Sequence, residues 1–403
     1  MGEKVVVSGV GVVSSIGLNK EDFWNNLIKG KSGISKVTLF DTSKFKRHYA
    51  GEIRKFDPTL FIPEEMTQFL GRASQFAIIA AKLALEDAHL NLNECRNKRL
   101  AIIVGTTMTE ASVLDFSSEM LLKEEWDEIT LKLLLNAFSP SIPRNIGYFL
   151  QLRGYNLLIP NACAAGNYAI GYGLDLIKKG KVDLAIVGGA EALSRVAFQG
   201  FQRLYAMAPR VCSPFDKNRK GMLLGEGAGI LILEPFREAE KRKVNIYAEV
   251  LGYGLSCDAY HMTIPKKEGI KKAMEKAIRE VGCSPENIDY ICAHGTGTIQ
   301  NDKAEVEAIK ELFGENYRKV PVSSLKSMIG HCMGAASSIE AVACCLAIER
   351  GIIPPTINFK TPDPECDIDC VPNKARKKKL NTVLNNGFAF GGNNCCVVFS
   401  RLS

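Results

Sequence analysis

The hydrophobic positions along the chain predict helices and strands that alternate. Alanine and leucine recur at helical spacing over Phe76 to His89, and an apolar strand follows at Leu100–Val104, ending in Gly-Thr-Thr. A second helix over Gly269 to Val281 leads to a strand at Tyr290–Ala293, which ends in His-Gly-Thr-Gly-Thr. Because the same order occurs twice, the pattern indicates a faint internal duplication.

The segments that follow these strands also match. A short apolar strand at Asn156–Ile159 turns sharply at Asn161-Ala162-Cys163 into a helix crowded with small residues. Its counterpart is Val320–Leu325, followed by the equally small-residue segment Gly330 to Ala336. A surface helix would carry charges at such positions, so we expect both helices to be buried on most sides.

Each half is then expected to return to a strand, at Asp183–Gly188 in the first half and Ile352–Ile357 in the second. The first half is longer because of a segment around Ser117 to Leu135, which we interpret as an inserted cap or subunit-contact element. Alternating strands and helices with buried central helices indicate an α/β fold of two similar halves. We place these halves at residues 1–245 and 246–403.

The composition is that of an ordinary globular protein, with 46% hydrophobic and 24% charged residues. No apolar run approaches the ~20 residues of a membrane span, and the first residues lack a signal-peptide core, so a cytoplasmic protein is expected. The net charge is +7, with its densest run at Lys374–Lys379. No nucleic-acid-binding module accompanies this charge, whereas an acidic protein partner would suit it.

The thirteen cysteines do not indicate a disulfide framework, because their number is odd and they lie in apolar contexts. Cys344-Cys345 and Cys395-Cys396 are typical of small core residues. Cys366 and Cys370 lack the second Cys or His pair that a zinc site needs. We therefore expect structural thiols everywhere except at Cys163.

Cys163 directly follows a strand and opens a small-residue helix. In that position the helix end is expected to favour the thiolate, and the Cys163 amide could donate to an oxyanion. A thioester intermediate would follow, since thiolates attack acyl carbons readily. A buried core cysteine is the alternative interpretation.

His294 and His331 are two of only five histidines. His294 follows a strand and precedes two glycines and two threonines that could admit a polar ligand. His331 is predicted to open a helix at the position equivalent to Cys163. Each histidine alone is also compatible with a structural role; their matched placement favours a joint catalytic site.

Several glycine-rich segments carry weaker signals. Gly9-Val10-Gly11 lacks the third glycine of a dinucleotide fingerprint, and Gly30-Lys31-Ser32 lacks the first glycine of a phosphate loop. Gly225–Gly229 is interpreted as tight strand packing. Gly387–Asn394, with two phenylalanines and a diglycine, is either a turn or a gate for apolar chains.

In combination these segments resemble the elongating β-ketoacyl-(acyl carrier protein) synthases of the thiolase-like superfamily. The resemblance runs from Val5 to Phe399. Its motifs are Asn161 to Gly166, Gly188 to Glu191, Phe215 to Lys217, His294 to Thr298, Lys326 to His331 and Gly387 to Asn394. It implies a five-layered αβαβα fold and a decarboxylating Claisen condensation, in fatty-acid or type II polyketide or polyene synthesis.

The resemblance also implies a role for each site residue. Cys163 would hold the growing acyl chain, and His294 and His331 would polarise a malonyl thioester. Lys326, supported by Glu340, would organise the site electrostatically. The amides of Cys163 and Phe390 would form the oxyanion hole, with Phe390 also the gate. The resemblance further implies substrate contacts from four side chains: Thr296, Thr298, Phe388 and Met108.

The resemblance implies no metal and no cofactor, because an acyl carrier protein supplies substrates on its phosphopantetheine. It implies a homodimer or a heterodimer with a ketosynthase-like homologue. Ala389 and Asn393 depart from the usual Gly and Thr of the gate loop, and the Ala206 to Ser213 loop is short.

Two alternatives within the same superfamily remain. A thiolase is disfavoured by His294, where thiolases generally have Asn, and by phenylalanines where they carry a second cysteine. A non-catalytic or partner-dependent subunit resembling a chain-length factor is disfavoured by Cys163 together with both histidines.

Overall fold

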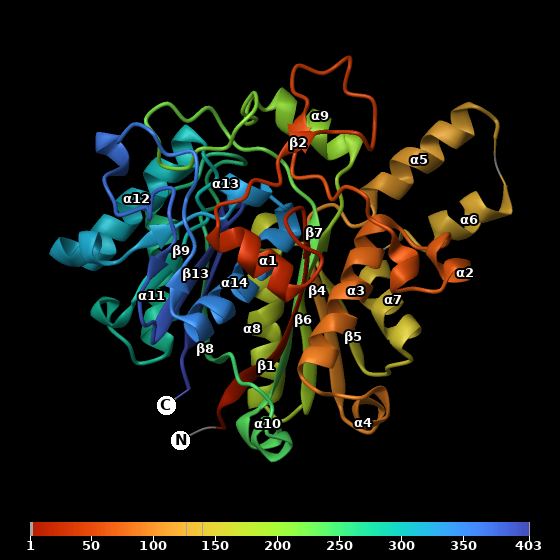
Figure 1. The fold of residues 1–403 in the computed structure, drawn as a ribbon, viewed down its shortest axis with the longest axis horizontal. Helices are drawn as coiled ribbons and strands as arrows, with labels where there is room; N and C mark the ends of the chain where they lie inside the picture. Colours follow the sequence, from red (N-terminus) through yellow and green to blue (C-terminus); the bar gives the residue numbers. More distant parts are fainter. Residues whose placement is uncertain (1–2, 126, 139, 403) are drawn as a thin grey trace.

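The computed structural model describes residues 3–125, 127–138 and 140–402, and its centre is a ten-stranded sheet (Figure 1). From edge to edge the strands are β5 (Tyr155–Ile159), β4 (Leu100–Gly105), β6 (Leu184–Glu191), β7 (Gly227–Pro235), β1 (Val5–Ser14), β8 (Ala248–Cys257), β14 (Asn393–Ser400), β13 (Thr382–Phe388), β9 (Tyr290–Cys292) and β10 (Val322–Ser323).

The strand order is mirrored about the junction of β1 and β8. These two strands pair only at Val6 with Glu249 and at Val7 with Ala248. On one side of the junction, β1 pairs antiparallel with β7 and β7 with β6, and β6, β4 and β5 are mutually parallel. On the other side, β8 pairs antiparallel with β14 and β14 with β13, and β13, β9 and β10 are mutually parallel. The internal duplication expected from the sequence is therefore present in the fold.

Helices lie between and outside the two half-sheets, giving five layers. Along β4, Ala101 and Ile103 join the central core, whereas Leu100, Ile102 and Val104 join the outer core. The central core also contains side chains of α8 (Ala165–Lys178) and α14 (Ala336–Arg350). The outer cores hold α3 (Arg72–Asp87) and α7 (Ser141–Leu150) on one side, and α11 (Lys267–Glu280) and α12 (Ile299–Phe313) on the other. This is the predicted αβαβα, thiolase-like fold.

The small residues of α8 and α14 allow the two central helices to pack backbone against backbone. A Cβ atom on Gly166 would lie 2.7 Å from the amide nitrogen of Ser338. The hydroxyl of Ser337 accepts the Asn167 amide at 3.0 Å. Larger side chains would separate the helices, so the composition of the central layer fixes how closely the two halves approach.

One predicted strand is wrong. Only Ile352–Ile353 forms a strand (β11), and it pairs with β12 (Arg376–Lys377) outside the main sheet. Pro354 and Pro355 follow at once, and proline cannot supply the amides that a central strand needs. The true counterpart of β6 is β13, which lies later in the chain.

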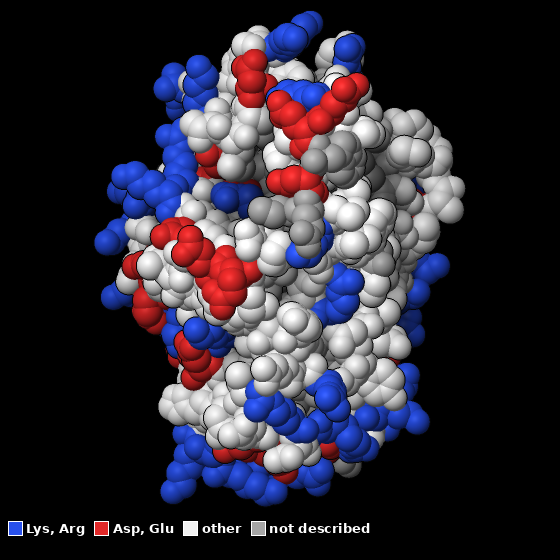
Figure 2. All heavy atoms as spheres, turned by 90° about the vertical axis from the view of Figure 1, so that its right-hand side faces the viewer, with Lys and Arg blue, Asp and Glu red and all other residues white. Residues whose placement is uncertain are grey.

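The inserted segment forms two helices, α5 (Ala111–Leu122) and α6 (Glu128–Leu135), which project from the body of the molecule (Figure 1). Several of its large apolar side chains are exposed, among them Leu121, Leu122 and Leu135, and so is the neighbouring Phe138. Figure 2 views this side, where a broad uncharged area has lysines and arginines along its lower edge.

The remaining regular elements are short. They are α1 (Lys20–Ile28), β2 (Ser35–Lys36), β3 (Tyr49–Ala50), α2 (Glu64–Thr67), α4 (Leu92–Arg96), α9 (Arg195–Arg203), α10 (Phe236–Arg242) and α13 (Lys326–Ile329). Within the described residues, no helix combines the length and apolar character needed to cross a bilayer.

The discounted glycine segments serve close packing. Side chains at Gly9 and Gly11 would collide with carbonyl oxygens of α3, and one at Gly229 would lie 2.6 Å from the Ile339 amide of α14. All thirteen cysteines are free thiols, and all except Cys257 and Cys283 are buried. Cys395 and Cys396 point into the central and the second outer core respectively.

Candidate active site

Cys163, His294 and His331 line a single cavity of about 410 Å³. They come from three separate segments, which the two halves of the fold bring together. Thr296, Thr298, Phe388 and Phe390 line the same cavity. The mouth includes the exposed residues Tyr205, His261, Met262 and Ile299. The cavity therefore combines a thiol and two imidazoles with apolar walls and two hydroxyls.

Cys163 is the middle residue of a three-residue 3-10 turn, Ala162–Ala164, which we call the nucleophile turn. Ala162 has φ +47°, a left-handed conformation that costs a non-glycine residue energy. The turn runs directly into α8, and the Cys163 side chain is 4% exposed. The sequence-based placement between strand and helix is correct.

The thiolate is not favoured at Cys163 in this state. Burial raises the pKa of the Cys163 thiol to about 12. Lys326 and hydrogen bonds from the amides of Phe390 and Cys163 oppose this rise but do not overcome it. Burial of the sulfur thus works against the thiolate that the helix end was expected to favour. The two amides nevertheless converge on the sulfur, as an oxyanion hole for an acyl group there requires.

His331 does not open a helix, contrary to the prediction. It bridges to Leu224 and precedes a second 3-10 turn, Met333–Ala335, which leads into α14. We call Met333–Ala335 the second turn. Its first residue, Met333, has φ +44°, so Gly334 and not His331 is the structural equivalent of Cys163.

The His331 ring has a defined tautomer. Its Nδ1 accepts the Met333 amide at 3.1 Å. The neutral ring must then carry its proton on Nε2, which makes Nε2–H a donor. Burial, reinforced by Lys326, lowers the His331 pKa well below the usual value, so the ring is neutral near pH 7.

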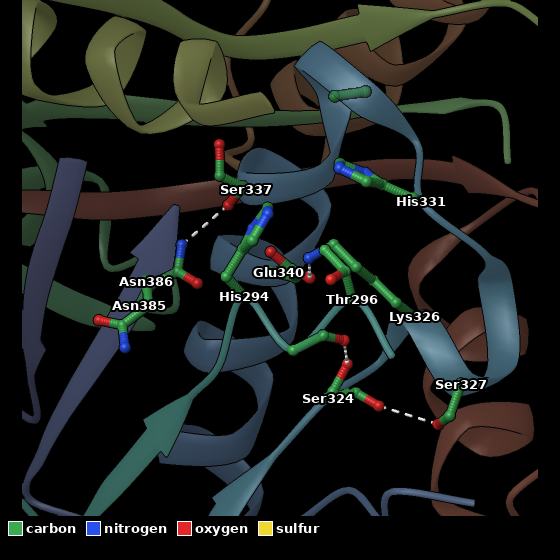
Figure 3. A network of polar contacts seen from close by, with 12 residues as sticks. His294, Thr296, Ser324, Lys326, Ser327, His331, Ser337, Glu340, Asn385 and Asn386 are labelled. Atoms are coloured by element: carbon green, nitrogen blue, oxygen red, sulfur yellow. Dashed lines mark hydrogen bonds and ion pairs between the residues drawn. The ribbon is translucent and has the colours of Figure 1, made fainter. Parts of the chain in front are cut away.

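His294 lies beside His331 in the buried part of the cavity (Figure 3). The two ring centroids are 5.3 Å apart in an edge-to-face arrangement. Burial, Lys326 and His331 together lower the His294 pKa well below its usual value. Its Nδ1 has no hydrogen-bond partner although it is buried. Two neutral imidazoles thus face the same space, and one ring nitrogen is left free for a ligand.

Lys326 and Glu340 form a buried ion pair next to the histidines (Figure 3). The Lys326 Nζ and Glu340 Oε1 atoms are 2.5 Å apart, and each side chain is 1% exposed. Burial lowers the Lys326 pKa, but Glu340 more than compensates, so the net shift is upward. The charge of Lys326 accordingly adds to the effect of burial, which is the larger cause of the lowered pKa of both imidazoles.

Of the remaining predicted site residues, Thr296, Thr298, Phe388 and Phe390 line the cavity and Met108 does not. The hydroxyls of Thr296 and Thr298 lie 2.9 Å apart at the cavity wall. Phe388 packs edge-on to His294, and Phe390 stacks on Phe201. Met108 does not line the cavity; it packs in an apolar cluster that also contains Phe390 and Phe201.

Sequence reasoning missed the buried acids that hold the site's backbone. Glu305 accepts the amides of His294 at 2.9 Å and Gly295 at 2.8 Å. Asp302 accepts the Gly297 amide at 3.1 Å. Both acids lie on the buried side of α12, three residues apart, and so on one face of the helix. This spacing, on a helix that directly follows a glycine-rich strand end, was the signal in the sequence that could have identified them.

The fold and the site define a class of protein: a thiolase-like enzyme whose cavity combines a buried cysteine with two neutral histidines. The comparisons agree. The model for "Beta-ketoacyl synthase, N-terminal domain" matches residues 2–239, and that for the C-terminal domain matches residues 247–360.

Relatives named 3-oxoacyl-(acyl-carrier-protein) synthase 2 are similar over 99% of this chain. The Coxiella burnetii protein is 38% identical over 99% of its own length, and the Synechocystis protein is 37% identical over 98%. Among solved structures, the ishigamide ketosynthase/chain length factor has 42% identity and TM-score 0.96, and a β-ketoacyl synthase from Burkholderia phymatum has 31% and 0.91. Both structural likenesses cover 100% of each chain. The chain belongs to the β-ketoacyl synthase family of acyltransferases.

Proposed function

We propose that the chain condenses a malonyl thioester with an acyl chain held on Cys163, and releases CO₂. The presence in one cavity of two imidazoles, which lie edge to face, and of a buried thiol that two backbone amides contact carries this proposal. Such a site can stabilise negative charge on oxygen at two places without an ionised base.

In the first step the Cys163 sulfur attacks an acyl thioester presented by an acyl carrier protein. The sulfur–carbon bond forms, the carrier thiol leaves, and the Cys163 proton passes to it. The transient oxyanion accepts the amides of Cys163 and Phe390. Because the resting thiol is neutral, no charge has to be buried before the acyl group arrives.

In the second step a malonyl thioester occupies the cavity with its carbonyl oxygen between the two histidines. Loss of CO₂ leaves an enolate, whose oxygen accepts Nε2–H of His331 and a ring N–H of His294. Neutral donors suit this role because they bind the enolate without protonating its carbon. Thr296 and Thr298 hold the pantetheine arm at the wall of the cavity.

In the third step the enolate carbon attacks the Cys163 thioester. The new carbon–carbon bond forms, the carbon–sulfur bond breaks, and the released thiolate takes up a proton from solvent. The overall condensation needs no metal or redox cofactor, because the carrier supplies both activated thioesters. Phe390, stacked on Phe201, would act as the gate between the cavity and the apolar cluster that contains Met108.

We further propose that the chain acts as a homodimer or as a heterodimer with a ketosynthase-like homologue. Within the chain, we propose that the boundary between the two halves lies at residue 245. The exposed apolar side chains of α5 and α6 support a subunit contact. A solved relative is a ketosynthase/chain length factor, and another is a type II polyketide ketosynthase in complex with its acyl-carrier protein.

Intact mass spectrometry tests this proposal. The purified protein is incubated with a panel of acyl-carrier thioesters, with and without a candidate partner subunit. We expect a mass increase of one acyl group, absent in Cys163→Ala, followed by condensation when malonyl carrier is added. Acylation elsewhere, or condensation without acylation of Cys163, would contradict the covalent step.

A further inference from the structure

Glu191, the last residue of β6, is a fully buried carboxylate that bonds to both halves of the molecule. Its oxygens accept the amides of Thr107 at 2.6 Å and Met108 at 3.1 Å, and the Thr106 hydroxyl at 3.2 Å. The fourth donor comes from the other half: the Gly334 amide, at 3.0 Å. One side chain therefore ties the end of β4 to the second turn.

The backbone amide that Glu191 binds is next in the chain to the amide that orients the His331 ring. Glu191 accepts the Gly334 amide, and the preceding amide, that of Met333, donates to His331 Nδ1. Met333 has φ +44°, so this turn is strained and requires an anchor. The His331 backbone is held by hydrogen bonds with Leu223 and Gly225, and its ring also packs edge to face on His294.

We propose that Glu191 is a positioning residue for malonyl decarboxylation, acting through the second turn on the tautomer and orientation of His331. The inference rests on the proposed function of His331. Without the carboxylate the Gly334 amide loses its acceptor and the strained Met333 conformation loses its anchor. The Met333 amide then leaves Nδ1, and Nε2–H no longer points at the enolate oxygen.

When ionised, Glu191 only accepts hydrogen bonds, and because burial raises its pKa to about 7 this form predominates above neutral pH. All four of its partners donate, so an amide in its place would direct NH₂ at some of these donors. Glu191→Gln is therefore a near-isosteric change that breaks the anchor. Glu191→Asp keeps the charge but shortens the reach, and it provides a second variant if the first folds poorly.

Glu110 offers a matched control. It is also fully buried in the first half and accepts two backbone amides, from Ala73 at 3.2 Å and Ser74 at 2.6 Å. Burial raises the pKa of both Glu110 and Glu191 to about 7. Glu110 precedes α5, its carboxylate binds amides at the start of α3, and it does not line the cavity. Glu110→Gln thus reproduces the structural damage without touching the second turn.

The experiment measures CO₂ release from malonyl carrier and, separately, acylation of Cys163. We expect Glu191→Gln to lower kcat for decarboxylation by roughly 10- to 100-fold, the scale of a misplaced catalytic group, with KM nearly unchanged. Acylation of Cys163 should not fall, because the Glu191 charge is one of the causes that raise the Cys163 pKa. Long-range ¹H–¹⁵N spectra of histidine-labelled protein should show a loss of the Nε2–H tautomer at His331. Glu110→Gln should change neither readout.

A double-mutant cycle makes the test sharper. In the His331→Ala background, Glu191→Gln should cause no further loss of decarboxylation, because its route to the chemistry is gone. An equal further loss, or a parallel fall in acylation in both glutamate variants, would overturn the positioning role. If His331→Ala itself leaves CO₂ release intact, the proposed function of His331 fails, whatever Glu191 does.

Discussion

The nucleophile turn and the second turn have the same backbone conformation but different residues at the middle position. Each is a 3-10 turn that begins with a left-handed residue, Ala162 or Met333, and leads into a buried central helix. Cys163 occupies the middle of the first and faces the cavity. Gly334 occupies the middle of the second, where a Cβ atom would collide with the Thr106–Thr107 peptide.

The difference shows how a duplicated fold comes to have one active site. The strand end of the first half, held by Glu191, lies over the second turn and leaves no room for a side chain. Over the nucleophile turn lie the cavity and the amide of Phe390. The second half instead contributes His294 and His331 to the cavity, so the proposed function divides the chemistry between the halves and holds the reactive carbon at only one of the two turns.

Removing the nucleophile should have the largest effect. Cys163→Ala is expected to abolish condensation, at least about 10³-fold, because no acyl-enzyme can form. Decarboxylation of malonyl carrier should remain measurable, since the histidines are intact. The measurement is a radiolabelled condensation assay run beside CO₂ release.

Cys345→Ala is the control for the loss of a buried thiol. Cys345 lies in the central core on α14 and not in the cavity, so only stability should change. Full condensation by Cys163→Ala would remove the distinction between the two turns.

Removing either histidine should reverse that pattern. His294→Ala and His331→Ala are each expected to lower CO₂ release by roughly 10²- to 10³-fold, the usual loss for one donor to a developing oxyanion. Cys163 should still become acylated in both, which intact mass would show. CO₂ release at the normal rate in both variants would refute the roles assigned to the second half.

A methyl group at Gly334 should damage the fold rather than the chemistry alone. Gly334→Ala drives a Cβ atom into the backbone of Thr106, and we expect a loss of about 2–3 kcal/mol in the free energy of unfolding. Gly200→Ala, inside α9 with open space around it, should instead leave stability equal or raise it by up to ~1 kcal/mol. Denaturant titration measures both, and equal stability for Gly334→Ala would mean that the second turn is not filled.

The sequence predicts the repeated strand-to-helix turns well because strands, small-residue helices and the residues between them are local patterns. The prediction that His331 opens a helix is wrong, because the turn Met333–Ala335 lies between His331 and α14 and its composition does not reveal it. The sequence also placed the returning strand at Ile352–Ile357, although prolines end it. The contact of Glu191 with the Gly334 amide joins segments far apart in the chain, so no local pattern reveals it.

The state of the Cys163 thiol provides the finest test of the nucleophile turn. Because burial raises its pKa to about 12, only a small fraction is thiolate near pH 7, and the alkylation rate should rise about tenfold per pH unit up to about pH 11. Iodoacetamide labelling followed by peptide mass spectrometry measures this rate. A plateau near pH 8 would mean that the turn stabilises the thiolate after all.

Lys326 provides the matching perturbation, since it opposes the effect of burial on the Cys163 pKa. Replacing it together with its partner, as Lys326→Met with Glu340→Gln, leaves neither charge buried without its counterpart. Alkylation of Cys163 at a fixed pH of about 9 should then slow several-fold, because the remaining thiolate has lost its nearest cation. An unchanged rate would show that the two amides alone govern the sulfur, and that the positive charge serves only the histidines of the second half.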